Sequence, residues 1–264
     1  MKLNLKHKHL KLLFLGAGSV GFFLRALLYA TGFDGRGLLQ RNHPAAIALW
    51  CLSAAALAAA LFFCRKISGP NAYKDAYPVS FSASMGGFAL MIALGVTGVR
   101  EFSEFSVRIH LLIWVLGWIC AAGMGYVAVC RLLGKKPYFL PHAALCIYFA
   151  LRMVSQYRQW SAVPQLYDYC FYLIAYVALM LSAYQQAAFD AGIGKHRALW
   201  ISGLMAVYLC CLSLKDAPDA LILLGGAIWA FTNLTNLTVR RRRVRPALNL
   251  DDSAPAKEND HADP

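Results

Sequence analysis

This chain is constrained most by where its carboxylates lie. All thirteen aspartates and glutamates fall in connectors, at the edges of apolar runs or in the C-terminal tail. Between Leu10 and Val239 the sequence is otherwise a series of apolar runs, each about twenty residues long, which matches the hydrocarbon thickness of a bilayer. The pattern predicts an all-α fold, a polytopic transmembrane helical bundle. It also predicts that no acid is buried among the spans, unlike in many proton-coupled transporters and intramembrane proteases.

Composition supports lipid as the main solvent of this chain. Hydrophobic residues make up 59% of it and charged residues only 15%, too few for the surface of a soluble protein. The net charge is +13, but the bases stand at the ends of apolar runs, so no nucleic-acid partner is expected. Eight cysteines lie within or beside these runs, as small packing residues do.

Counted along the chain, the apolar runs predict about eight helical spans. They cover residues 12–31, 45–64, 81–99, 109–131, 139–158, 169–188, 198–214 and 219–239. The connectors are short, so residues 1–240 are expected to form a single transmembrane helical domain. Residues 241–264 are expected to form a basic anchor and a disordered, polar cytoplasmic tail.

Lysines and arginines set the expected orientation. With a cytoplasmic N-terminus, the segments on that side carry most of the 26 lysines and arginines, as the positive-inside rule requires. The largest group follows the last span and is expected to contact the anionic headgroups of the lipid bilayer; it consists of Arg240, Arg241, Arg242, Arg243 and Arg245. An even number of spans places both termini in the cytoplasm, with the protein in a cell membrane.

Small residues mark positions where helices can approach closely. Gly86 in the third span and Gly117 and Gly125 in the fourth are expected to pack helix against helix. Residues 16–21 match the dinucleotide-binding pattern GxGxxG. That pattern needs a βαβ unit around it, and the residues that follow form another apolar helix, so helix packing is the better interpretation.

One set of polar side chains predicts a ligand site facing outward. Arg25 and Arg152 each lie about seven residues before the outer end of their span, or about 10 Å deep at 1.5 Å per residue, and His110 enters from the same side. The full candidate set is Arg25, Tyr29, His110, Tyr148, Arg152, Gln156 and Tyr172. Such a pocket would favour a polar or anionic ligand. Alternatively, the arginines snorkel, or Arg152 pairs with Asp168 or Asp34, and the tyrosines are interfacial anchors.

Catalytic and cofactor signatures are absent from the sequence. It has no HExxH, GxSxG or P-loop motif, so no catalytic residue is assigned and an enzyme is not favoured. His110 and His142 open spans on opposite sides of the membrane, so they cannot share a haem iron. No metal and no cofactor are expected.

Four stretches resemble a family of bacterial multi-span membrane proteins without assigned activity. They run from Leu27 to Leu39, Ser155 to Tyr169, Ala188 to Gly194 and Leu224 to Trp229. The resemblance covers the overall pattern of the eight spans and implies a bacterial cytoplasmic membrane. It implies no activity, cofactor or site residue.

Two functional classes follow. The first is a permease-like or ligand-sensing membrane protein with an outward-facing pocket for a polar or anionic ligand. The alternative is a structural or partner-binding subunit of a membrane complex, with the spans at 81–99 and 109–131 as the contact surface.

Overall fold

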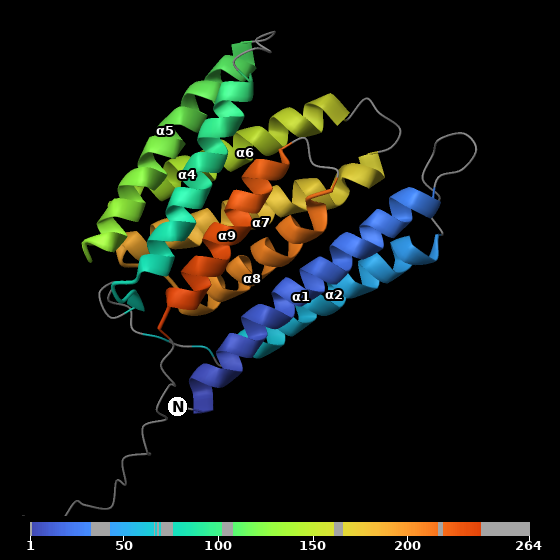
Figure 1. Ribbon diagram of the computed structural model, residues 1–264, viewed down its shortest axis with the longest axis horizontal. Coiled ribbons are helices and arrows are strands. Elements are labelled where there is room, and N and C mark those ends of the chain that lie inside the picture. Colours follow the sequence, from blue (N-terminus) through green and yellow to red (C-terminus); the bar gives the residue numbers. More distant parts are fainter. Residues whose placement is uncertain are drawn as a thin grey trace, which may run out of the picture.

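The described part of the chain consists of α-helices joined by short connectors (Figure 1). The computed structural model describes residues 2–32, 43–65, 67, 69, 76–101, 108–160, 166–215 and 219–238, without the side chains of 2–8, 108–110, 159–160 and 166–169. Within these ranges there are eight helices and no strand. The helices are α1 (Lys2–Thr31), α2 (Pro44–Cys64), α4 (Phe81–Glu101), α5 (Arg108–Leu132), α6 (Leu140–Trp160), α7 (Leu166–Ala191), α8 (His196–Ser213) and α9 (Ala220–Asn236). The predicted all-α bundle is confirmed.

The apolar runs located most helix ends to within three residues. The exception is α1, which begins at Lys2, ten residues before the predicted start. Six of the described helices are long and apolar enough to cross a membrane; α6 and α9 are not among them. In α6 the apolar run is interrupted by Arg152, Gln156 and Arg158, and α9 has only 17 residues. The chain is therefore a polytopic membrane protein in which α6 is a distinctly polar helix.

Six of the helices form a closed circuit of contacts. Each of α4, α5, α6, α7, α8 and α9 packs on the next one along the chain, and α9 closes the circuit by packing on α4. Their inward side chains belong to one continuous hydrophobic cluster. We call this circuit the six-helix ring.

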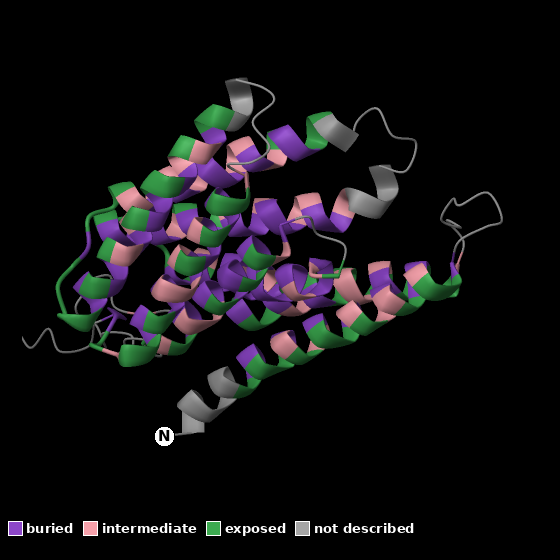
Figure 2. Ribbon diagram, turned by 45° about the horizontal axis from the view of Figure 1, so that its top comes forward, coloured by how far each residue is buried: buried purple, intermediate pink, exposed green. Residues whose placement is uncertain are grey.

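The hairpin of α1 and α2 lies outside the six-helix ring. The two helices run side by side along one edge of the molecule in Figure 1, and their principal partner in the ring is α8. In the apolar stretch of α8, 72% of residues are buried, against 22% in α2. Figure 2 shows this difference as purple along the central helices and green on the outer faces. An apolar groove of about 400 Å³ is lined by residues of α7 and α8 and by Leu57 of α2.

Glycines allow the ring to close between α4 and α9. A Cβ on Gly86 of α4 would overlap the hydroxyl of Thr232 and lie 3.2 Å from Cα of Trp229. A Cβ on Gly225 of α9 would lie 2.6 Å from Cβ of Ala93. The two backbones are thus too close for any larger side chain at these crossing points.

Candidate functional site

A single buried carboxylate organises one end of the six-helix ring. Asp219, the residue before α9, is 5% exposed. Its Oδ2 accepts hydrogen bonds from the hydroxyls of Tyr172 at 2.6 Å and Tyr176 at 2.9 Å. Arg152 donates from Nε to the same oxygen at 2.9 Å and from Nη2 to Oδ1, and Gln156 donates at 3.4 Å. We call these residues, with Glu101, the Asp219 cluster.

The Asp219 cluster joins four helices of the ring. Arg152 and Gln156 come from α6, Tyr172 and Tyr176 from α7, and Asp219 opens α9. Arg152 Nη2 also pairs with Oε1 of Glu101, the last residue of α4, whose side chain is 26% exposed. Arg152 is therefore shared between two carboxylates, and its charge is neutralised within the cluster.

Charge and hydrogen bonding compensate for the burial of Asp219. A buried carboxylate is costly unless it is paired and hydrogen-bonded. Arg152 supplies the opposite charge and two hydrogen bonds, and the hydroxyls of Tyr172 and Tyr176 supply two more. Removing any one of these partners would leave the buried carboxylate incompletely paired.

A second polar cluster lies at the opposite end of the ring. His142, near the start of α6, donates from Nδ1 to Oδ2 of Asp190 in the last turn of α7, at 2.6 Å, and neither side chain is exposed. Gln186 donates to Asp190 Oδ1 at 3.5 Å and accepts from the hydroxyl of Tyr77 at 2.8 Å. The imidazole of His142 stacks on Trp229 of α9 with ring centroids 5.8 Å apart. These residues form the Asp190 cluster.

An apolar layer separates the two clusters. On α6, His142 and Arg152 are ten residues apart, which is about 15 Å along the helix. Between them lies Phe149, which is fully buried, as are Leu179 of α7, Leu90 of α4 and Met124 of α5. The ring is therefore filled by apolar side chains in its middle and carries a buried, charged network at each end.

The structure brings together four of the seven candidate ligand residues. Arg152, Gln156 and Tyr172 meet at Asp219, and Tyr148, 2% exposed, lies one turn from Arg152 on α6. The spacing of four residues along α6 predicted this shared face. The ligand role of these residues stays a prediction.

Arg25 and Tyr29 lie in a different place. The Arg25 guanidinium is 5.8 Å from the Tyr29 ring and 5.9 Å from the ring of Phe171 on α7. Lys215 sits over the same Tyr29 ring at 5.6 Å. Phe171 and Tyr172 are neighbours on α7 and contact different partners, so Arg25 and Asp219 lie against different faces of α7.

Several predicted residues lie outside the described set. They are the side chains of His110 and Asp168, residue Asp34, and the basic anchor and tail from Arg240 onward.

Of the predicted packing glycines, a Cβ on Gly117 would lie 3.3 Å from the Tyr148 ring, and one on Gly125 would lie 2.8 Å from Met91 Sδ. Both glycines thus face other helices of this chain, as Gly86 does.

The expectation that no acid is buried was wrong. Asp219 is 5% exposed and Asp190 is 2% exposed. Asp219 is buried because side chains of α6 and α7 surround it; they are Arg152, Gln156, Tyr172 and Tyr176. Asp190 is buried because His142 of α6 and Gln186 of α7 pack on it. Arg152 was the signal in the sequence that pointed to a buried acid, because a buried cation needs a nearby anion.

Comparisons with known proteins add no assignment. No protein-family model, curated protein or solved structure matches this chain. The resemblance to a bacterial membrane family stays a prediction. Among the described residues, no group of three or more histidines, cysteines, aspartates or glutamates is arranged to hold a metal ion.

Proposed function

We propose that this protein is permease-like and moves a small polar or anionic solute along the axis of the six-helix ring. One observation carries the proposal: the ring has a buried, charged cluster at each end and an apolar layer between them. Ionisable groups are costly at membrane depth, and they commonly mark solute or ion pathways there. In the state described, the Asp219 and Asp190 clusters would act as two closed gates.

The helices that carry the two clusters support the permease proposal. α6, α7 and α9 each contribute to both ends, through Arg152 and His142 on α6 and through Tyr172 and Asp190 on α7. A small tilt of one helix would therefore separate donors from acceptors at one end while leaving the other end paired. Such coupled opening and closing is what alternating access requires.

A flux assay with the purified protein in liposomes tests the proposal. We expect at least one solute in a panel of small carboxylates, phosphates and amino acids to enter faster than into protein-free liposomes. Arg152→Gln should change that rate by about tenfold, because hydrogen bonds between charged groups contribute about 1.5–3 kcal/mol. Arg158→Gln is the matched control, since Arg158 is an exposed arginine on the same helix, and its rate should stay within about twofold.

A double variant separates transport from folding. Arg152→Gln with Asp219→Asn removes both charges of the pair, so it should recover stability without recovering parental flux. Recovery of both would assign the cluster to folding alone. A panel in which no solute enters faster than into empty liposomes would remove the permease proposal.

The alternative class, a partner-binding subunit, has less support. Gly86, Gly117 and Gly125, the proposed contact positions, face helices of the same chain. On α4 the glycine that faces outward is Gly95, where a Cβ would meet no described atom within 4 Å. A partner surface on α4 would therefore centre on Gly95. The cytoplasmic placement of both termini and headgroup binding by the basic anchor remain parts of the proposal.

A further inference from the structure

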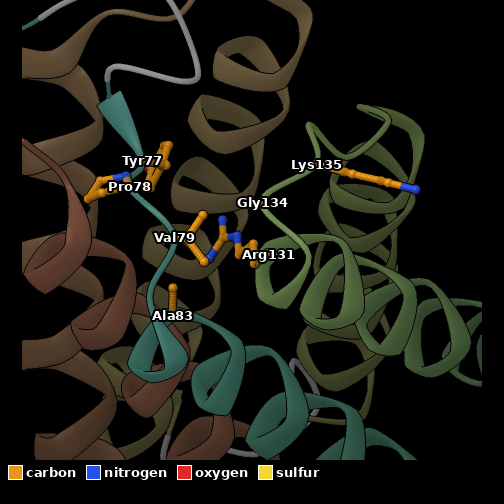
Figure 3. A pocket seen from close by; sticks show the side chains of 7 residues that line it. All are labelled: Tyr77, Pro78, Val79, Ala83, Arg131, Gly134 and Lys135. Atoms are coloured by element: carbon orange, nitrogen blue, oxygen red, sulfur yellow. The ribbon is translucent and has the colours of Figure 1, made fainter.

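A cavity of about 290 Å³ opens at the same end of the ring as the Asp190 cluster. It lies between the segment that leads into α4 and the end of α5 (Figure 3). Its lining includes Tyr77, Val79, Ala83, Arg131, Gly134 and Lys135. One of its lining residues, Tyr77, also belongs to the Asp190 cluster, and the Asp219 cluster contributes none.

Arg131 is a buried cation in the wall of this cavity. It is 5% exposed, and its Nη1 donates to Oδ1 of Asn233. Its guanidinium lies 5.2 Å from the ring centroid of Tyr77. Its Nε and Nη2 are buried without a hydrogen-bond partner, and no carboxylate of the described chain pairs with it. A buried guanidinium with two unused donors is costly unless an anion completes it.

The unused donors of Arg131 form one edge of the guanidinium fork. Nε and Nη2 point in parallel, and this edge binds two oxygens of a carboxylate or phosphate at once. Figure 3 shows the guanidinium turned toward the Tyr77–Val79 segment that forms the opposite wall. The structure therefore places two buried, parallel donors without partners in a residue that lines the cavity.

Two further sources of positive potential border the same space. Ala83 lies in the first turn of α4, where backbone N–H groups have no acceptor within the helix and the helix dipole favours an anion. Lys135 is exposed at the rim. Gly134 has φ +66°, and a Cβ there would lie 2.7 Å from Val79 Cγ2, so this glycine lets the end of α5 approach the cavity wall.

We propose that this cavity binds a phosphate group. Arg131 would hold two of its oxygens, Lys135 would add charge from the rim, and the start of α4 would add N–H donors from a third direction. Donors from three directions suit a tetrahedral oxyanion better than a planar carboxylate. Val79 of the lining is 69% exposed, and Leu133, next to Gly134, is 63% exposed. Exposed apolar side chains beside a charged rim are compatible with a membrane interface. The phosphate belongs to an anionic phospholipid or to a small soluble solute, and the site stands whether or not the protein transports.

Binding is tested on the full-length purified protein with two probes. The first is inorganic phosphate against chloride at equal ionic strength, read as the melting temperature in a neutral detergent. The second is phosphatidylglycerol against phosphatidylcholine in nanodiscs, read as lipid retained by native mass spectrometry and as the melting temperature. A saturable phosphate response assigns a soluble ligand, and a preference for phosphatidylglycerol assigns a lipid headgroup. The absence of both overturns the proposal.

Variants at the rim keep the test independent of folding. Lys135→Gln should weaken binding about two- to fivefold, as for a partly exposed charge contact, whereas Lys136→Gln, its exposed neighbour that does not line the cavity, should leave binding unchanged. Val79→Glu places a carboxylate within the cavity wall and should abolish the response by occupying Arg131. Arg131→Gln should weaken binding more than tenfold, that is by about 1.4 kcal/mol or more. A phosphate or lipid response that is equal in the parent, Lys135→Gln and Val79→Glu would be a general salt or surface effect and would overturn the proposal.

Discussion

Arg152→Gln is expected to lower the free energy of unfolding by about 3–5 kcal/mol, the usual cost of removing one partner of a buried ion pair. The reason is that Asp219, 5% exposed, would remain charged beside an uncharged side chain. Adding Asp219→Asn removes the stranded charge and should restore most of the loss. Reversible unfolding in mixed micelles, or melting temperatures in one detergent, measures the cycle.

Arg158→Gln controls for the loss of any arginine from α6. Arg158 is exposed on the same helix, so its replacement should change stability by less than about 1 kcal/mol. If Arg152→Gln and Arg158→Gln proved equally mild, the Asp219 cluster would not stabilise the fold as expected here. If the double variant were as unstable as the two single variants summed, the two residues would not be coupled.

Gly86→Leu is expected to lower the free energy of unfolding by about 1–3 kcal/mol, the range seen for overpacked cores. The hydroxyl of Thr232 could rotate away from a new side chain, but Cα of Trp229, 3.2 Å from the position of a Cβ, belongs to the backbone of α9 and cannot. The ring would be forced open where α4 meets α9. Thermal melting of the purified protein measures the loss.

Gly95→Leu is the matched control on α4. A Cβ there meets no described atom within 4 Å, and leucine favours helix more than glycine does. The change should therefore be neutral or slightly stabilising. Equal destabilisation at Gly86 and Gly95 would mean that glycine is needed along the whole helix and not only at the α4–α9 crossing.

The helices could be predicted from the sequence because bilayer thickness sets the length of an apolar run. The same run lengths could not show which helices close the ring. Closure depends on contacts between helices far apart in the sequence, such as Gly86 of α4 against Trp229 of α9 and Gly225 of α9 against Ala93 of α4. This is why the sequence did not identify the partner of Arg152. Asp34 and Asp168 were the expected partners, but Asp219, 67 residues further along the chain, is brought in by α9.

The sequence predicted only part of the candidate site, and the reason is related. Periodicity correctly grouped Arg152 with Gln156, because residues four apart share a helix face. Periodicity says nothing about how one helix is turned relative to another. Arg25 was therefore grouped with Arg152 by depth alone, although α1 lies outside the ring and Arg25 lies against Phe171, on another face of α7 from Tyr172.

The position of the α1–α2 hairpin has a consequence for how the protein is made. Its main docking surface, α8, is synthesised only after α4, α5, α6 and α7. At about 5–20 residues per second, the ribosome needs on the order of ten seconds to extend the chain from the end of α2 to the end of α8. During that delay the hairpin has to persist in lipid as two independent spans, and α2 has the highest hydropathy of the six span-length helices. The order of the helices along the chain therefore requires assembly in two stages, with insertion first and docking later.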